Sequence, residues 1–206
     1  MKQQWLSRSG TQEVLLVFGG WALGPGPFED LSGDSDVLFV DDYSRLDDPL
    51  SDLAQYDRVT LIAFSFGVAS SAHWLTQTGL QPDRLIAVSG TLSPADVDHG
   101  IAPDMIRATA DQLSTASFAK FCRRAGLAGP VPEIDIDAAR AELHAVIERG
   151  TAPDHKFDRV WIPQRDRIIP TRAQQAAWAG QPDAVREISA PHVPFAAGQS
   201  WKEWIA

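Results

Sequence analysis

The chain has 206 residues, of which 44% are hydrophobic and 22% charged, and this composition is typical of one globular domain rather than of a disordered chain. Its formal net charge of −9 argues against a general nucleic-acid binder, because neutralising phosphates requires a basic surface. A single cysteine, Cys122, excludes an intramolecular disulfide, and the lack of a signal peptide or a long apolar run predicts a soluble, cytoplasmic protein without a membrane partner.

Six short apolar runs predict the strands of a buried sheet. Continuous apolar runs are typical of strands that are buried on both faces. Four are clear and two are weaker: residues 14–18, 37–40, 59–63 and 85–88, then 159–162 and 185–188. Helical patterns at 67–78 and 171–179 lie between strands. The sequence therefore predicts an α/β fold with a mostly parallel sheet covered by helices on both faces.

One segment, from about residue 93 to about residue 154, interrupts the alternation of strands and helices. It contains no convincing strand, but it has three helical patterns at 103–113, 115–124 and 138–149. We therefore expect a single domain over residues 1–206, with a helical lid inserted between two core strands at about 93–154.

Ser65 is the candidate nucleophile. It follows the apolar run at 59–63 almost directly, Gly67 lies two residues after it, and a helical pattern begins at once. This is the layout of a nucleophile elbow, a tight strand-to-helix turn that projects the serine hydroxyl above the sheet. Ala63 replaces the first glycine of the usual Gly-x-Ser-x-Gly pattern. On this pentapeptide alone, an ordinary serine in a turn is an equal alternative.

A serine hydroxyl needs a base to activate it and an acid to orient the base. Asp166 follows the run at 159–162, and His192 follows the run at 185–188. Taken singly, Asp166 is better interpreted as a surface acid paired with Arg165 or Arg167, and a structural histidine is an equal alternative for His192. Together with Ser65, however, they appear in the order serine, acid, histidine, each after a predicted strand, which predicts a catalytic triad.

An oxyanion hole of two backbone N–H groups is expected beside this serine. Phe66, the residue after the nucleophile, supplies one candidate, and Trp21 supplies the other from the Gly19-Gly20 loop after the first buried run. A plain turn at the two glycines is the alternative. The sequence has no Gly-x-Gly-x-x-Gly fingerprint and no Cys/His cluster, so we expect neither a dinucleotide nor a metal.

These motifs together resemble one family, the pimeloyl-[acyl-carrier protein] methyl ester esterases of BioG type. The resemblance covers nearly the whole chain and includes the Ala-x-Ser-x-Gly form of the elbow. It is carried by residues 18–21, 41–43, 63–67, 100–103 and 118–124 and by the late aspartate and histidine. The resemblance implies an α/β-hydrolase that needs no cofactor. It also implies the reaction, which converts pimeloyl-[acyl-carrier protein] methyl ester to pimeloyl-[acyl-carrier protein] and methanol in biotin biosynthesis.

The resemblance also implies an acyl carrier protein as the partner that bears the pimeloyl methyl ester. That carrier is acidic, so a chain of net charge −9 must dock it through a local positive patch. Lys120, Arg123 and Arg124 on the predicted helix at 115–124 are the candidates, with a solvated basic helix face as the alternative. Two other functions remain open: a carboxylesterase or thioesterase acting on small free acyl esters, and a non-catalytic ligand-binding module. The sequence leaves the oligomeric state open.

Overall fold

A single seven-stranded sheet forms the centre of the computed structural model, which describes residues 1–206. Its strands lie in the order β1-β3-β2-β4-β5-β6-β7, and every neighbouring pair is parallel except β1 and β3. The strands are β1 (Lys2–Ser7), β2 (Glu13–Phe18), β3 (Asp36–Asp41), β4 (Arg58–Phe64), β5 (Arg84–Val88), β6 (Arg159–Pro163) and β7 (Val185–Ile188). The mostly parallel sheet and all six predicted strands are confirmed.

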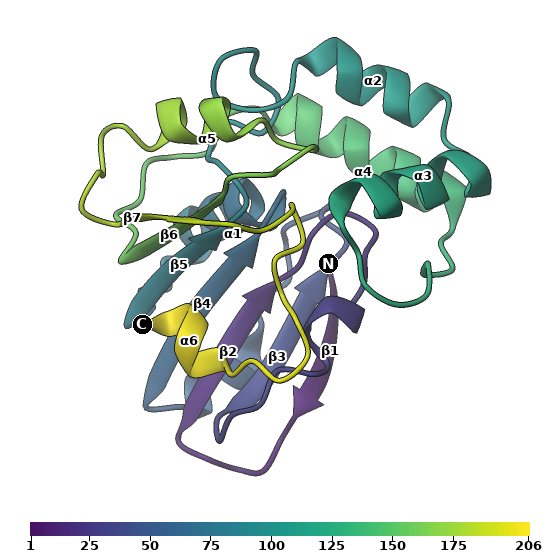
Figure 1. The fold of residues 1–206 in the computed structure, drawn as a ribbon. Helices are drawn as coiled ribbons and strands as arrows, with labels where there is room; N and C mark the ends of the chain where they lie inside the picture. Colours follow the sequence, from purple (N-terminus) through teal and green to yellow (C-terminus); the bar gives the residue numbers. More distant parts are fainter.

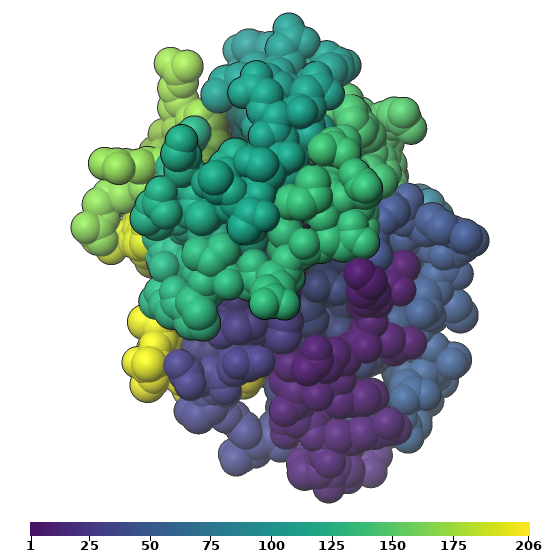
Figure 2. Space-filling view, turned by 90° about the vertical axis from the view of Figure 1, so that its right-hand side faces the viewer, coloured from purple at the N-terminus to yellow at the C-terminus, as the bar shows by residue number.

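The seventh strand, β1, has no counterpart among the predicted strands. It pairs antiparallel with β3 at one edge of the sheet, and the first three of its six residues are exposed. Figure 2 shows it in purple on the surface, below the teal and green helices. Because one side of an edge strand has no partner and its faces stay partly wet, β1 needs no continuous apolar run, and its sequence KQQWLS gave no strand signal.

Helices cover both faces of the sheet (Figure 1). Helix α1 (Gly67–Thr78) packs on one face through Trp74, and the short α6 (Trp201–Ile205) packs on the other through Trp204. Adjacent side chains of β2 divide between these two cores, Leu16 with Trp74 and Leu15 with Trp204, as the two-residue period of a strand requires. Helix α5 (Thr171–Ala177) precedes β7. No helix is long and apolar enough to cross a membrane.

Three helices lie between β5 and β6, in the segment that we call the helical insertion (residues 93–154). They are α2 (Pro103–Asp111), α3 (Thr115–Ala125) and α4 (Ile136–Arg149), and no strand lies among them. The segment leaves and rejoins the sheet at neighbouring points, because the N–H of Ala152 donates to the carbonyl of Leu92 at 2.8 Å. Figure 1 places the insertion above the carboxyl ends of the parallel strands, the edge at which α/β sheets carry their sites.

Candidate active site

Ser65 occupies a strained turn between β4 and α1. Its φ is +56°, in the left-handed region that non-glycine residues rarely adopt, and its N–H donates to the carbonyl of Val88 at 2.9 Å. Two glycines make the turn possible. A Cβ at Gly67 would lie 2.5 Å from the carbonyl oxygen of Phe18, and a Cβ at Gly90 would lie 2.4 Å from that of Ser65. The backbone therefore has the form of a nucleophile elbow.

The structure brings the three predicted residues together in one buried series. His192 lies with Nε2 3.0 Å from Ser65 Oγ and with Nδ1 2.7 Å from Asp166 Oδ2. The side chains of His192 and Asp166 are 1% and 0% exposed, and Asp166 pairs with neither Arg165 nor Arg167. Such a series can take a proton from a serine hydroxyl and stabilise the resulting imidazolium.

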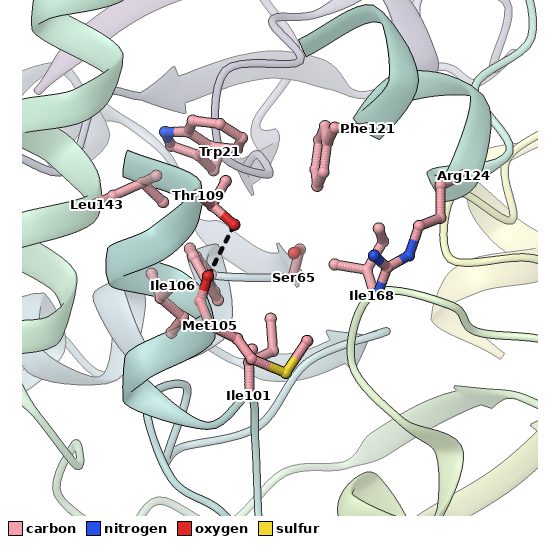
Figure 3. A pocket seen from close by; sticks show the side chains of 11 residues that line it. Trp21, Ser65, Ile101, Met105, Ile106, Thr109, Phe121, Arg124, Leu143 and Ile168 are labelled. Carbon is pink, nitrogen blue, oxygen red and sulfur yellow. Dashed lines mark hydrogen bonds between the residues drawn. The ribbon is translucent and has the colours of Figure 1, made fainter. Parts of the chain in front are cut away.

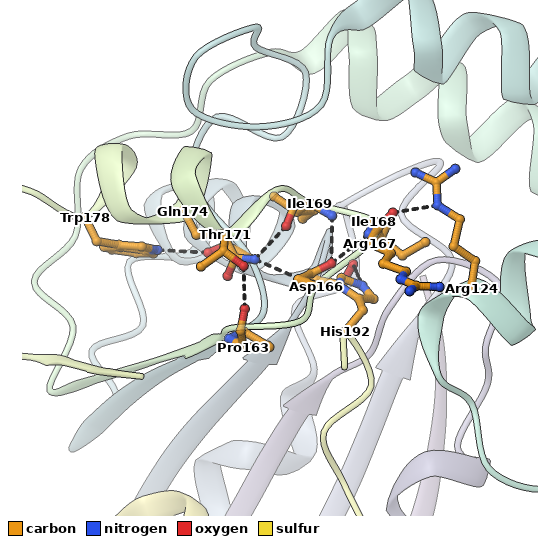
Figure 4. Close-up of polar contacts among 12 residues, drawn as sticks. Arg124, Pro163, Asp166, Arg167, Ile168, Ile169, Thr171, Gln174, Trp178 and His192 are labelled. Atoms are coloured by element: carbon orange, nitrogen blue, oxygen red, sulfur yellow. Dashed lines mark hydrogen bonds and ion pairs between the residues drawn. The ribbon is translucent and has the colours of Figure 1, made fainter. Parts of the chain in front are cut away.

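The Asp166 carboxylate is held by four donors (Figure 4). Its Oδ1 accepts the N–H groups of Ile168 and Ile169 at 2.7 and 2.9 Å. Its Oδ2 accepts from Gln174 Nε2 at 2.8 Å as well as from His192. The sequence analysis did not single out Gln174, because nothing in the sequence distinguishes it from its exposed neighbour Gln175.

Two backbone N–H groups beside Ser65 donate no hydrogen bond within the chain. They belong to Trp21 and Phe66, and both residues line a cavity with Ser65. The loop that carries Trp21 comes close, since a Cβ at Gly20 would lie 3.4 Å from Ser65 Cβ. The indole of Trp21 donates to the carbonyl of Ala139 at 2.9 Å, which fixes this loop against α4. Free N–H groups at such a place can stabilise a negative oxygen.

The cavity above Ser65 is mostly apolar (Figure 3). It encloses about 80 Å³, and eight of its eleven lining residues are hydrophobic. A second hollow of about 280 Å³ between α2 and α3 shares four wall residues with it and extends to Lys120. The shared residues are Trp21, Thr109, Phe121 and Arg124. The two hollows are therefore neighbours, and the second one reaches the surface of α3.

The three basic residues predicted to dock a carrier differ in their contacts. Lys120 and Arg123 are exposed on α3 and enter no ion pair. Arg124 donates from Nε to the carbonyl of Arg167 at 2.6 Å and also lines the apolar cavity. Arg124 thus contacts the loop that carries the acid, whereas Lys120 and Arg123 face solvent.

A buried carboxyl lies behind the Trp21 loop. Glu142 on α4 accepts the N–H of Tyr43 at 3.2 Å, and the Tyr43 hydroxyl donates to the carbonyl of Gly19 at 2.8 Å. Burial raises the pKa of Glu142 to about 8, and the negative charges of Asp42 and Asp41 add to this effect. No group of three His, Cys, Asp or Glu side chains in the chain is placed to hold a metal ion.

Solved structures with the same fold include BioG from Haemophilus influenzae, which is 26% identical, matches over 100% of both chains and gives a TM-score of 0.89. A bromoperoxidase from Bacillus anthracis and an esterase from Exiguobacterium antarcticum each give 0.65, at 16% and 14% identity. They cover 93% and 95% of this chain, which matches 88% and 86% of theirs. The predicted α/β-hydrolase fold is therefore confirmed.

Two curated relatives are similar in sequence. An uncharacterized protein from Haemophilus influenzae is 29% identical over an alignment of 217 positions, and the alignment covers 98% of this chain and 97% of that protein. A malonyl-[acyl-carrier protein] O-methyltransferase from Bacteroides fragilis is 28% identical over 88% of this chain, but the match spans only 39% of that protein's length. The family model described as "Pimeloyl-ACP methyl esterase BioG" matches residues 1–204. This chain therefore belongs to the BioG family, and it is a hydrolase of the α/β-hydrolase type.

Proposed function

We propose that the chain hydrolyses the methyl ester of pimeloyl-[acyl-carrier protein], releasing methanol and leaving pimeloyl-[acyl-carrier protein] for biotin biosynthesis. The observation that carries this proposal is the hydrogen-bonded series from Ser65 through His192 to Asp166, buried beneath an apolar cavity in a member of this family. In acyl transfer to a serine of this kind, the base takes the proton of the serine and the acid orients the base.

In this mechanism Ser65 Oγ attacks the ester carbonyl while His192 Nε2 takes its proton. Asp166 keeps the proton of His192 on Nδ1 and stabilises the imidazolium. The free N–H groups of Trp21 and Phe66 donate to the oxyanion of the tetrahedral intermediate. Methanol then leaves with the proton from His192, and a water molecule activated by His192 releases the acid.

The acyl chain is proposed to lie in the apolar cavity, with the helical insertion acting as a lid. The methyl ester stands at the far end of the acyl chain from the carrier, so the chain must run from Ser65 outward. The hollow between α2 and α3 supports this direction, because it shares four wall residues with the cavity and reaches Lys120 on the surface. A mostly apolar cavity wall suits the methylene groups of a pimeloyl chain.

The carrier is proposed to dock on α3 through Lys120, Arg123 and Arg124. The cations of the insertion are not equivalent, since Arg107 and Arg140 pair with aspartates of their own helices. Lys120 and Arg123 have no such partner and remain available to an acidic protein. Arg124 retains free guanidinium nitrogens, because only its Nε is bonded to the Arg167 carbonyl.

The test compares the wild type with Ser65→Ala on carrier-bound pimeloyl methyl ester, with loss of the methyl group followed by mass spectrometry. We expect Ser65→Ala to lower the rate by at least about 10³-fold, because it removes the nucleophile. Ser71→Ala is the matched control. Ser71 is also buried, but its hydroxyl bonds only to the Val68 carbonyl within α1, so its removal should leave turnover unchanged.

A short nitrophenyl ester is assayed in parallel. Turnover of this ester without turnover of the carrier-bound ester would retain Ser65 as nucleophile and refute the proposed substrate. Equal activity of wild type and Ser65→Ala would refute the proposed nucleophile itself.

A further inference from the structure

Gln174 contacts the same oxygen of Asp166 that bonds to His192. Its side chain lies on α5 and is 0% exposed. Nε2 donates to Asp166 Oδ2 at 2.8 Å and to the carbonyl of Ile169 at 2.9 Å. The same Oδ2 lies 2.7 Å from His192 Nδ1 (Figure 4). Two donors thus converge on one carboxylate oxygen.

The other end of the Gln174 amide has no partner. Its Oε1 is buried and accepts no hydrogen bond. Reversing the amide would bring Oε1 against two acceptors, Asp166 Oδ2 and the Ile169 carbonyl, so only one orientation is possible. An unpaired buried carbonyl costs stability. Packing alone does not account for a buried amide that satisfies the acid and leaves its own oxygen unpaired.

The first turn of α5 is fixed to the sheet and aims Gln174 at the acid. The hydroxyl of Thr171 donates to the carbonyl of Pro163, the last residue of β6, at 2.7 Å. The N–H of Gln174 donates to the carbonyl of Pro170 at 3.1 Å. Residues three apart on a helix share a face, so Thr171 and Gln174 both point toward the end of β6, where Asp166 follows.

We propose that Gln174 is a positioning residue that fixes the plane of the Asp166 carboxylate, so that Oδ2 meets His192 Nδ1. The backbone N–H groups of Ile168 and Ile169 hold only Oδ1. Without Gln174, His192 is the only donor left at Oδ2, so the carboxylate can turn more freely about its last side-chain bond and the bond to His192 weakens. The catalytic consequence rests on the proposed function, in which His192 is the base.

The experiment uses Gln174→Met, which keeps the length of the side chain and removes its donor. On a short nitrophenyl ester, where carrier docking plays no part, we expect kcat to fall about ten- to a hundredfold with little change in KM, since one hydrogen bond to a charged group is lost. Proton NMR reports the His192 Nδ1 proton directly. Its downfield signal should move upfield or exchange faster with water in the variant.

Gln175→Met is the matched control, because Gln175 lies on the same helix but is exposed and donates to Glu187. It should change neither readout. If Gln174→Met folds poorly, Gln174→Glu keeps the size and polarity of the side chain. A carboxyl buried against Asp166 keeps its proton at neutral pH and can still donate it, but at higher pH it ionises and cannot donate, so kcat and the downfield signal should be lost as the pH rises.

An unchanged Nδ1 signal together with kcat within twofold of wild type would overturn the positioning role of Gln174. A wild type that cleaves no ester would instead refute the proposed function. In that case the Nδ1 signal alone still decides whether Gln174 orders the pair of Asp166 and His192.

Discussion

Strained backbone gathers at single residues where strands end. Ser65, Ser89 and Asp42 follow β4, β5 and β3 and have φ angles of +56°, +51° and +60°. Left-handed backbone is costly for residues with a Cβ, so it persists only where the surroundings fix it. At Ser65 the surroundings are the hydrogen bond to Val88 and the close approach of Gly67 and Gly90. The position of the candidate nucleophile is therefore held by its neighbours rather than by its own preference.

Glu142 gives a prediction about stability and pH. Its folded-state pKa of about 8 lies above the ordinary value of 4.5, so between these values the folded chain holds a proton that the unfolded chain has released. The free energy of unfolding should therefore fall as the pH rises through this window. Glu142→Gln still accepts the N–H of Tyr43 but cannot ionise. At the upper end of the window, the free energy of unfolding of this variant should exceed that of the wild type by on the order of a few kcal/mol.

Urea unfolding at about pH 5 and about pH 9 measures this difference. The control is Glu148→Gln, which changes an exposed glutamate of the same helix and should leave the pH dependence as it is in the wild type. A variant at Glu142 whose stability follows the wild-type pH curve would show that this carboxyl does not titrate in the window.

The residues of the site that could be predicted are those whose order along the chain is characteristic of the fold. Ser65, Asp166 and His192 were predicted because each follows a buried run, and the structure brings them together. Gln174 and Glu142 were missed. A buried polar side chain on an amphipathic helix has the same sequence pattern as an exposed one, and only the packing of distant segments reveals its burial.

At the scale of elements, the end of α3 joins the helical insertion to both loops of the site. The carbonyl of Ala125 accepts the N–H of Val193, next to the candidate base, at 2.9 Å. Gly126, with φ at +80°, packs against Pro191, and Arg124 bonds to the loop that carries the acid. The insertion therefore takes part in holding the site as well as covering it.

Gly126→Ala tests this junction. The new Cβ would lie 2.5 Å from Pro191 Cβ and would also occupy a left-handed conformation. We expect displacement of the loop that carries His192, a loss of about 1–3 kcal/mol of stability and at least a tenfold lower kcat on small esters. Gly129→Ala is the control, because its φ of +90° imposes the same strain with no atom within 4 Å of the new Cβ. Equal losses in both variants would show that backbone strain alone is responsible.

Elements were predictable from the sequence to the extent that they are buried. The strands β2 to β5 are continuous apolar runs, and the helices of the insertion have clear apolar periodicity. The edge strand β1 and the five-residue α6 were missed, since the first is largely exposed and the second is too short to establish a period.

At the scale of the whole molecule, the charge of −9 opposes approach to the acidic carrier of the proposed function, so the proposed docking must depend on where the positive charges lie. The double variant Lys120→Glu/Arg123→Glu should raise KM for the carrier-bound ester about tenfold or more and leave small-ester turnover unchanged. The wild-type KM should also rise with salt, because exposed charges are screened.

Lys202→Glu is the control for this charge reversal. It changes the net charge in the same direction, but it lies on α6, away from α3 (Figure 1). A KM that rises equally in the control would attribute the effect to total charge, and a KM that changes in neither variant would refute docking on α3.

The meeting of the two ends of the helical insertion, at Leu92 and Ala152, has a consequence for how such proteins diverge. A segment whose ends are neighbours can be exchanged for one of different length without moving the strands that flank it. Here β5 and β6 pair directly with each other beneath the junction. One continuous stretch of gene therefore encodes the segment above the candidate site, and recombination within that stretch can change what the site admits while the sheet below is inherited intact.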